Sequence, residues 1–212
     1  MKKVLFFAVM VLSLLVVNSC SQSEKLFNGK DLSNWNFVLA GEDVFPEDIF
    51  FVQDGVINIK GNPFGYMYTK TKYSDYVLEL EWRWPGSESN SGIFFMIAET
   101  NNPFPNGIEC QLRAGNAGDL VMLGGSDLDE YVQPEGSERP NFPIIRKRED
   151  SNEKAVGEWN KAKIEVKDGK ITVNINGVLQ NQGTNKVKEG YIGLQSEGGL
   201  IQFRNVRLTN QK

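Results

Sequence analysis

The stretch from Asp75 to Glu99 constrains the fold more than any other part of the chain. In its first half, apolar residues occupy every second position: Tyr76, Leu78, Leu80, Trp82 and Trp84. Successive side chains of a β-strand point to opposite faces, so this alternation predicts a strand with one large apolar face. The opposite face would carry Glu79, Glu81 and Arg83. We therefore expect a core strand whose charged face has a separate role.

Short strand patterns continue along most of the chain, and turn residues separate them. Lys161–Lys167 and Lys170–Asn176 flank Asp168-Gly169, a dipeptide typical of two-residue hairpins. Many short strands with regular turns indicate a sandwich or barrel. The exception is a long connection at about 124–158, expected to pack along one rim. The other predicted strands are Val56–Lys60, Tyr66–Thr69, Tyr76–Trp84, Gly92–Ala98, Gly107–Arg113, Leu120–Leu123, Tyr191–Gln195 and Leu200–Leu208.

The N-terminus has the pattern of an export signal. Basic residues Lys2 and Lys3 precede an apolar run, Val4–Val17, that is short for a membrane span. Val17-Asn18-Ser19-Cys20 resembles a bacterial lipobox. We predict a lipoprotein signal peptide at 1–19, a lipidated Cys20 with a tether at 20–25, and one domain at 26–212. The protein would be exported and anchored by lipid to the cell envelope, at the outer membrane or the periplasmic face. The alternative is an ordinary cleaved signal with an incidental cysteine.

The chain contains no histidine, which excludes Ser-His-Asp and Cys-His catalysis and histidine-ligated zinc. Its formal net charge of −4 argues against nucleic acid as a partner. Cys110 lies between apolar Ile108 and Leu112 and is expected to be a buried small hydrophobe. The remaining carboxylate, amide, guanidinium and aromatic groups suit a carbohydrate site. No cofactor and no metal-ligand motif is identified, although such oxygen groups also suit a divalent cation such as Ca²⁺.

Polar groups recur on the predicted outward faces of two further strands. In the strand around Cys110, alternation places Glu109 and Gln111 outward, and in the strand from Tyr191 it places Gln195 and Glu197 outward. If these strands and the strand of Glu81 line one curved sheet, their polar groups meet in one groove. Glu81 and Glu109 are the candidate catalytic residues of that groove.

Several segments resemble one family in the same order. They are Leu26-Phe27-Asn28-Gly29-Lys30-Asp31-Leu32-Ser33-Asn34-Trp35, Tyr73–Arg83 with Asn90-Ser91-Gly92-Ile93-Phe94-Phe95, Gly157-Glu158-Trp159-Asn160, Asn176-Gly177, Gly193-Leu194-Gln195 and Phe203-Arg204-Asn205. The chain resembles the 3-keto-disaccharide hydrolase domain family (DUF1080) from about Lys25 to Leu208.

The resemblance implies an all-β, concanavalin A-like jelly-roll sandwich of two antiparallel sheets that acts on glycosides with a ketone at C3. Such a ketone acidifies the C2 proton, so a carboxylate base can start elimination of the aglycone, and water then adds to the enone. Glu81 or Glu109 would be the base. Substrate binding would fall to Arg83, Asn90, Gln111, Gln195 and Glu197. The alternative is a non-catalytic glycan-binding module of a sugar-utilisation system.

Overall fold

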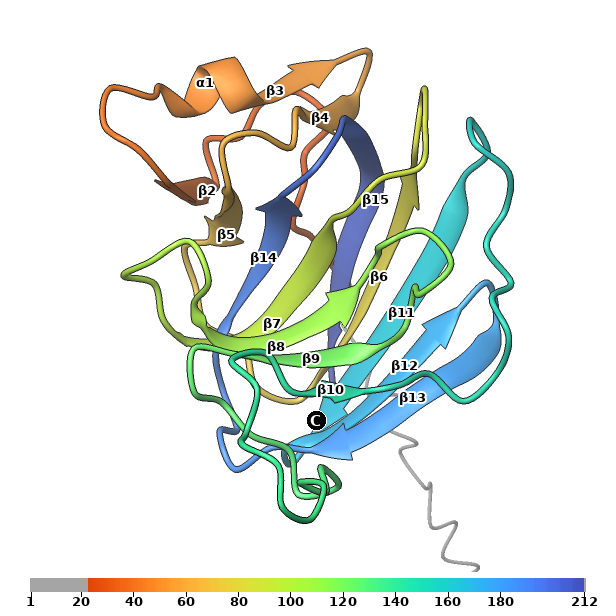
Figure 1. The fold of residues 1–212 in the computed structure, drawn as a ribbon. Helices are drawn as coiled ribbons and strands as arrows, with labels where there is room; N and C mark the ends of the chain where they lie inside the picture. The colour runs from red at the N-terminus through yellow and green to blue at the C-terminus, as the bar shows by residue number, and fades with distance from the viewer. Residues whose placement is uncertain (1–22, 212) are drawn as a thin grey trace, which may run out of the picture.

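The computed structural model describes residues 23–211 and consists of two antiparallel β-sheets packed face to face (Figure 1). Sheet A has eight strands, and β1 lies beside β15. Its order is β13 (Val178–Thr184), β12 (Lys170–Ile175), β11 (Asn160–Lys167), β6 (Tyr76–Arg83), β15 (Ile201–Asn210), β4 (Val56–Ile59) and β3 (Phe50–Gln53), with β1 (Ser23–Lys25) off this path.

Sheet B has seven strands. Its order is β10 (Ile144–Ile145), β9 (Leu120–Leu123), β8 (Asn106–Gln111), β7 (Gly92–Glu99), β14 (Tyr191–Ser196), β5 (Gly65–Thr69) and β2 (Trp35–Leu39). The one helix among the described residues is α1 (Pro46–Ile49), a single turn that leads into β3. None of the described helices is long and apolar enough to cross a membrane.

The main hydrophobic core fills the space between the two sheets. The alternating residues of β6 are buried in it, as the sequence predicts, and Ile108 and Cys110 enter it from β8 in the other sheet. Leu26 and Phe27 are also buried there. The apolar side chains of β6 and β8 thus point into one shared interior. The polar side chains that alternate with them on these two strands therefore point outward.

The predicted hairpin and long connection are both present. Lys167 pairs with Lys170 across the turn, where Asp168 and Gly169 have φ of 49° and 80°, the left-handed conformations that a tight hairpin turn needs. The connection between β9 and β11 contains the two-residue strand β10, which pairs with β9. The prediction of two antiparallel sheets with a long loop is confirmed.

Several edge strands have no clear signal in the sequence and were not predicted. Residues 23–25, at the end of the predicted tether, form β1 and pair with Arg207–Thr209 of β15. This strand is exposed along its length and is formed by backbone pairing, so its side chains carry no alternating signal. Cys20 and the signal segment lie outside the described residues.

Candidate functional site on the outer face of sheet B

The groove predicted to join Glu81 and Glu109 does not exist. Glu81 lies on β6 of sheet A, and Glu109 lies on β8 of sheet B. Both strands direct their apolar side chains into the shared core, so their polar side chains point away from each other on opposite faces of the sandwich. Alternation gave the correct outward face of each strand but could not tell that the strands belong to different sheets.

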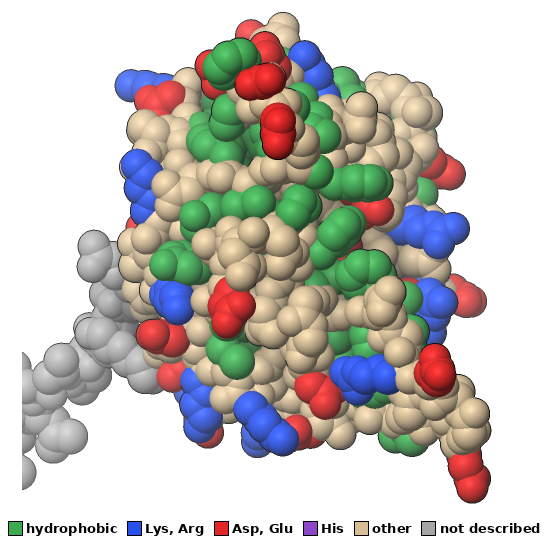
Figure 2. Space-filling model, turned by 60° about the vertical axis from the view of Figure 1, so that its left-hand side comes forward, with side chains coloured by type: hydrophobic (Ala, Val, Ile, Leu, Met, Phe, Trp, Pro, Cys, Tyr) green, Lys and Arg blue, Asp and Glu red, His purple; other side chains and the backbone are tan. Residues whose placement is uncertain are grey.

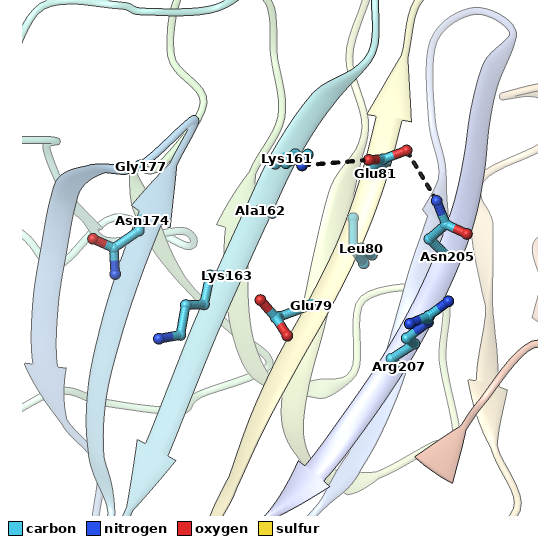
Figure 3. Close-up of a pocket in the computed structure, with 10 residues that line it drawn as sticks. All are labelled: Glu79, Leu80, Glu81, Lys161, Ala162, Lys163, Asn174, Gly177, Asn205 and Arg207. Atoms are coloured by element: carbon cyan, nitrogen blue, oxygen red, sulfur yellow. Dashed lines mark hydrogen bonds and ion pairs between the residues drawn. The ribbon is translucent and has the colours of Figure 1, made fainter. Parts of the chain in front are cut away.

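Glu81 is tied into an ion-pair network on the outer face of sheet A. One carboxylate oxygen accepts hydrogen bonds from Arg204 Nε at 2.5 Å and Asn205 Nδ2 at 3.1 Å. Lys161 Nζ lies 3.9 Å from the other oxygen. Figure 3 shows Glu81, Lys161 and Asn205 along a shallow groove of about 560 Å³, whose lining carries charges of both signs. Glu81 therefore holds adjacent strands of sheet A together.

Arg83 has a similar structural position at the end of the same strand. Its Nε donates to Gln202 Oε1 at 2.7 Å, and Nη1 donates to the carbonyl of Gly157 at 3.2 Å. Its guanidinium lies 4.5 Å from the ring centre of Trp159, which Arg204 approaches at 4.0 Å. Arg83 is thus held on the outer face of sheet A, with Glu81.

On the outer face of sheet B, strand register brings polar residues into one row. Gln111 of β8 pairs with Gly92 of β7, and Gln195 of β14 pairs with Tyr66 of β5. Because Leu194 pairs with Ile93, Gln195 is the next neighbour of Gly92. The Ser91 hydroxyl donates to the carbonyl of Gln195 at 2.9 Å and fixes β7 against β14 at this point.

Gly92 leaves a gap in this row, and the side chain of Glu109 fills it. A β-carbon at position 92 would overlap Oε1 of Glu109. The Glu109 carboxyl therefore lies on the bare backbone of β7 and reaches towards β14. Only glycine permits this close approach.

The second carboxyl group is that of Glu197, directly after β14. Gln195 Nε2 donates to Glu197 Oε2 at 2.7 Å, and the Asn90 side chain also hydrogen-bonds this carboxylate. Burial raises the pKa of Glu197, and the hydrogen bonds from Asn90 and Gln195 partly oppose that rise. Hydrogen bonds to a carboxylate favour its ionised form.

Glu109 is in a very different environment. It is 3 % exposed, and Oε1 has no hydrogen-bond partner among the described residues. Burial first, and then the charge of Glu197, raise the pKa of Glu109 well above its ordinary value. The site therefore contains a buried carboxyl that favours its proton beside a hydrogen-bonded carboxyl that loses it more readily.

Further buried polar atoms face this pair. Gln195 is 1 % exposed and Tyr66 is fully buried, yet Gln195 Oε1 and the Tyr66 hydroxyl have no partner in the described part of the chain. Asn90 Oδ1 is also buried and has no hydrogen-bond partner among the described residues. Such atoms cost free energy, of order 1–3 kcal/mol each, and mark a place where a ligand would be recognised.

A second apolar cluster surrounds the carboxyl pair. It contains Tyr66 and Phe94, whose ring centres are 5.5 Å apart, and continues to Tyr68 and Tyr191. Figure 2 shows hydrophobic side chains gathered across this face with isolated acidic groups among them. Apolar walls around a few convergent polar groups are the usual composition of a small-molecule site.

The described residues contain no group of three histidine, cysteine or acidic side chains that could hold a metal ion. The oxygen atoms of Glu109, Glu197, Gln195 and Asn90 are of the type that Ca²⁺ accepts. A divalent cation at this site stays a prediction.

A family model described as "3-keto-alpha-glucoside-1,2-lyase-like domain" matches residues 22–209. The chain belongs to this family. The predicted resemblance is thereby confirmed for almost the whole chain, and the family is one of carbohydrate-active, 3-keto-disaccharide hydrolase-like domains.

Two relatives illustrate the sequence and fold similarity of this family member. A curated 3-keto-disaccharide hydrolase from Bacteroides thetaiotaomicron is 24 % identical over 225 residues, which cover 86 % of this chain and 76 % of that protein. The structure of a candidate glycosyl hydrolase from Parabacteroides distasonis has a TM-score of 0.66 and 22 % identity, and the match covers 90 % of this chain and 94 % of that one.

The same two-sheet fold occurs in a carbohydrate-binding module, CBM66 from Bacillus subtilis. The TM-score is 0.58 at 13 % identity, and the match covers 84 % of this chain and 96 % of the module. The prediction of a jelly-roll sandwich is confirmed by these likenesses and by the two observed sheets.

Within this family member, the structure brings four of the predicted site residues together: Glu109, Asn90, Gln195 and Glu197. Gln111 lies in the same row, where its Oε1 accepts a hydrogen bond from the backbone of Arg113. Tyr66 was missed, although the alternation of Tyr66 and Tyr68 with buried Met67 signals their outward face. No pattern within one strand could show that Glu109 lies over Gly92.

Proposed function

We propose that this family member cleaves 3-keto-glycosides at the Glu109–Glu197 pair on the outer face of sheet B. The observation that carries the proposal is the contrast between these two neighbouring carboxyl groups. Glu109 is buried and its Oε1 has no hydrogen-bond partner among residues 23–211, whereas Glu197 accepts hydrogen bonds from two amides. Pairs of titratable groups with contrasting environments commonly divide acid and base roles.

In this proposal Glu197 is the general base and Glu109 the general acid. The C3 ketone acidifies the C2 proton, which the Glu197 carboxylate removes. The electron pair forms the enolate and then the C1–C2 double bond as the C1–O bond breaks, and Glu109 gives its proton to the departing oxygen. Water adds across the double bond with the roles reversed, so the net reaction is hydrolysis. Asn90 and Gln195 are positioning residues for Glu197.

The test is turnover of a 3-keto-glycoside by Glu197→Gln and Glu109→Gln. Each variant keeps the shape of the side chain but removes its acid–base function, so we expect at least a 100-fold loss of kcat, in the range typical of general acid–base catalysis. Glu81→Gln is the matched control and should stay within about twofold of the parent protein. Full activity of both Glu109 and Glu197 variants, with the fold intact by circular dichroism, would refute the site.

A non-catalytic glycan-binding module is the second candidate, because the fold is shared with a carbohydrate-binding module. It predicts saturable binding of the same saccharides, measured by calorimetry, with no product release by the parent protein.

We also propose that the protein is a lipoprotein, exported and anchored at Cys20 to the cell envelope. The support is the basic start, apolar run and lipobox-like Val17-Asn18-Ser19-Cys20 of the sequence. Metabolic labelling with a fatty acid should mark the parent protein and not Cys20→Ala. Equal labelling of both would contradict the anchor.

A further inference from the structure

Three phenylalanine rings form a continuous surface on the outer side of sheet B. The ring centres of Phe64 and Phe104 are 5.8 Å apart, and those of Phe104 and Phe142 are 5.3 Å apart. Phe64 is 46 % exposed and Phe142 is 43 % exposed, while Phe104 between them is half-buried. We call these three residues the phenylalanine surface.

The phenylalanine surface is assembled from segments that are far apart in the sheet. Phe64 precedes β5, Phe104 lies between β7 and β8, and Phe142 precedes β10. Because β14 separates β7 from β5, the contact between Phe64 and Phe104 spans a strand. Figure 1 shows the β7–β8 connection standing out from sheet B beside β5. The three rings therefore bridge sheet B instead of belonging to one loop.

The rings stand beside strands whose outward residues lie on the same face as the carboxyl pair. Phe64 lies two residues before the outward-facing Tyr66, and Phe142 lies two residues before the outward-facing Ile144. Phe64 and Phe142 lie in the bends just before β5 and β10, the two strands that carry Tyr66 and Ile144. The phenylalanine surface therefore adjoins the apolar cluster on the outer face of sheet B, the face that carries Glu109.

The link to the site is close at Phe64. Gly65, the next residue, pairs with Ser196, and the Ser196 hydroxyl donates to the carbonyl of Pro63 at 2.9 Å. Ser196 lies between Gln195 and Glu197 in the chain. The backbone that carries Phe64 is therefore bonded directly to the segment that carries the proposed base.

The phenylalanine surface favours an apolar, aromatic ligand. Phenylalanine has no polar atom, so these rings offer stacking and apolar burial but no hydrogen bond. Each Å² of apolar surface that a ligand covers contributes about 25 cal/mol to the free energy of binding. An aromatic ring stacked on a phenylalanine contributes about 0.5–1.5 kcal/mol more. A polar sugar ring gains less here than a ring without hydroxyl groups.

We propose that the phenylalanine surface is the leaving-group site and that it binds an aromatic ring, so the preferred substrates are aryl 3-keto-glycosides. This inference rests on the proposed function, because it assigns the departing part of the substrate beside Glu109 and Glu197. The sugar with its ketone would occupy the polar row, and the aromatic aglycone would stack on Phe64 and Phe142.

The experiment compares phenyl and methyl 3-keto-glucosides in the parent protein, in Phe64→Ala and in Phe142→Ala. We expect the parent KM to be at least tenfold lower for the phenyl substrate. Each variant should reduce that preference to threefold or less. Both rings lie at the surface outside the two hydrophobic clusters, so their loss should leave the fold intact. Phe45→Ala is the matched control, since Phe45 is 62 % exposed at the start of α1 and outside the phenylalanine surface.

The outcomes separate this inference from the proposed function. Turnover of both substrates with equal KM, or a phenyl preference unchanged in both phenylalanine variants, would overturn the leaving-group site alone. Turnover of neither substrate would overturn the proposed function. In that case, calorimetry with phenyl and methyl glucosides still tests the surface. Tighter binding of the phenyl compound, lost in Phe64→Ala, would support it, and equal binding would refute it.

Discussion

At the scale of single residues, Glu81 and Glu109 have the same side chain but opposite surroundings. Glu81 forms ion pairs with Arg204 and Lys161, and Asn205 donates a further hydrogen bond to the oxygen that Arg204 binds. Glu109 is buried over Gly92, and one of its oxygens has no partner in the described part of the chain. Local charge and burial, not residue type, give Glu109 the character of an acid.

The raised pKa of Glu109 has a consequence for stability. The folded protein binds this proton more tightly than the unfolded chain, so stability is full below about pH 4 and falls as pH rises towards the folded pKa. Glu109→Gln removes this loss and should stabilise the protein at pH 8 by about 1–3 kcal/mol. Near pH 4 the variant and the parent should be almost equally stable.

Thermal unfolding at pH 4 and pH 8 measures this difference, and each kcal/mol should shift Tm by about 2–4 °C in a chain of this size. The exposed Glu79→Gln is the control, for which no such pH-dependent gain is expected. A Glu109→Gln gain of the same size at both pH values would show that the effect is not linked to the proton.

At the scale of elements, strand β7 shapes the site because Gly92 has no side chain. Gly92 opens a space on the outer face, and the side chain from β8 enters that space to approach β14. Gly92 also has neighbours on both sides, Gln111 and Gln195, so its position is set by the register of three strands.

Gly92→Ala should therefore displace Glu109 and lower kcat by about 100-fold, because a misplaced catalytic group costs rate even when the fold remains. Steady-state kinetics on a 3-keto-glycoside measures the loss. Gly86→Ala is a matched control, since no atom lies within 4 Å of its added Cβ. Parent-like kcat in Gly92→Ala would argue against the assigned position of Glu109.

The strands also differ in how well they can be predicted from their sequences. Strand β6 was predicted almost to its ends because its alternation is strong. Strand β13 was not predicted, since its sequence Val-Leu-Gln-Asn-Gln-Gly-Thr is largely polar. Its buried Asn181 instead donates to the carbonyls of Gly118 and Ile145. Hydrogen bonds to distant loops hold this strand, and these cannot be foreseen from a local pattern.

At the scale of the whole molecule, the sandwich separates two polar faces that look alike in sequence. The outer face of sheet A carries paired charges around Glu81, and the outer face of sheet B carries the Glu109–Glu197 pair within an apolar surround. The core between them keeps the faces apart. This separation is why Glu81→Gln serves as the control for catalysis: it removes the ion pairs with Lys161 and Arg204 but touches no part of the proposed site.

The sequence by itself determined the β-sandwich class, the inward and outward faces of the strong strands, and the family. These follow from alternation and from motifs that are local in the chain. The tertiary structure alone decided which sheet each strand joined, and hence that Glu109 meets Glu197 and not Glu81. Strand pairing joins segments far apart in sequence, such as Gly92 and Gln195, and their contact arises only when the whole sheet has formed.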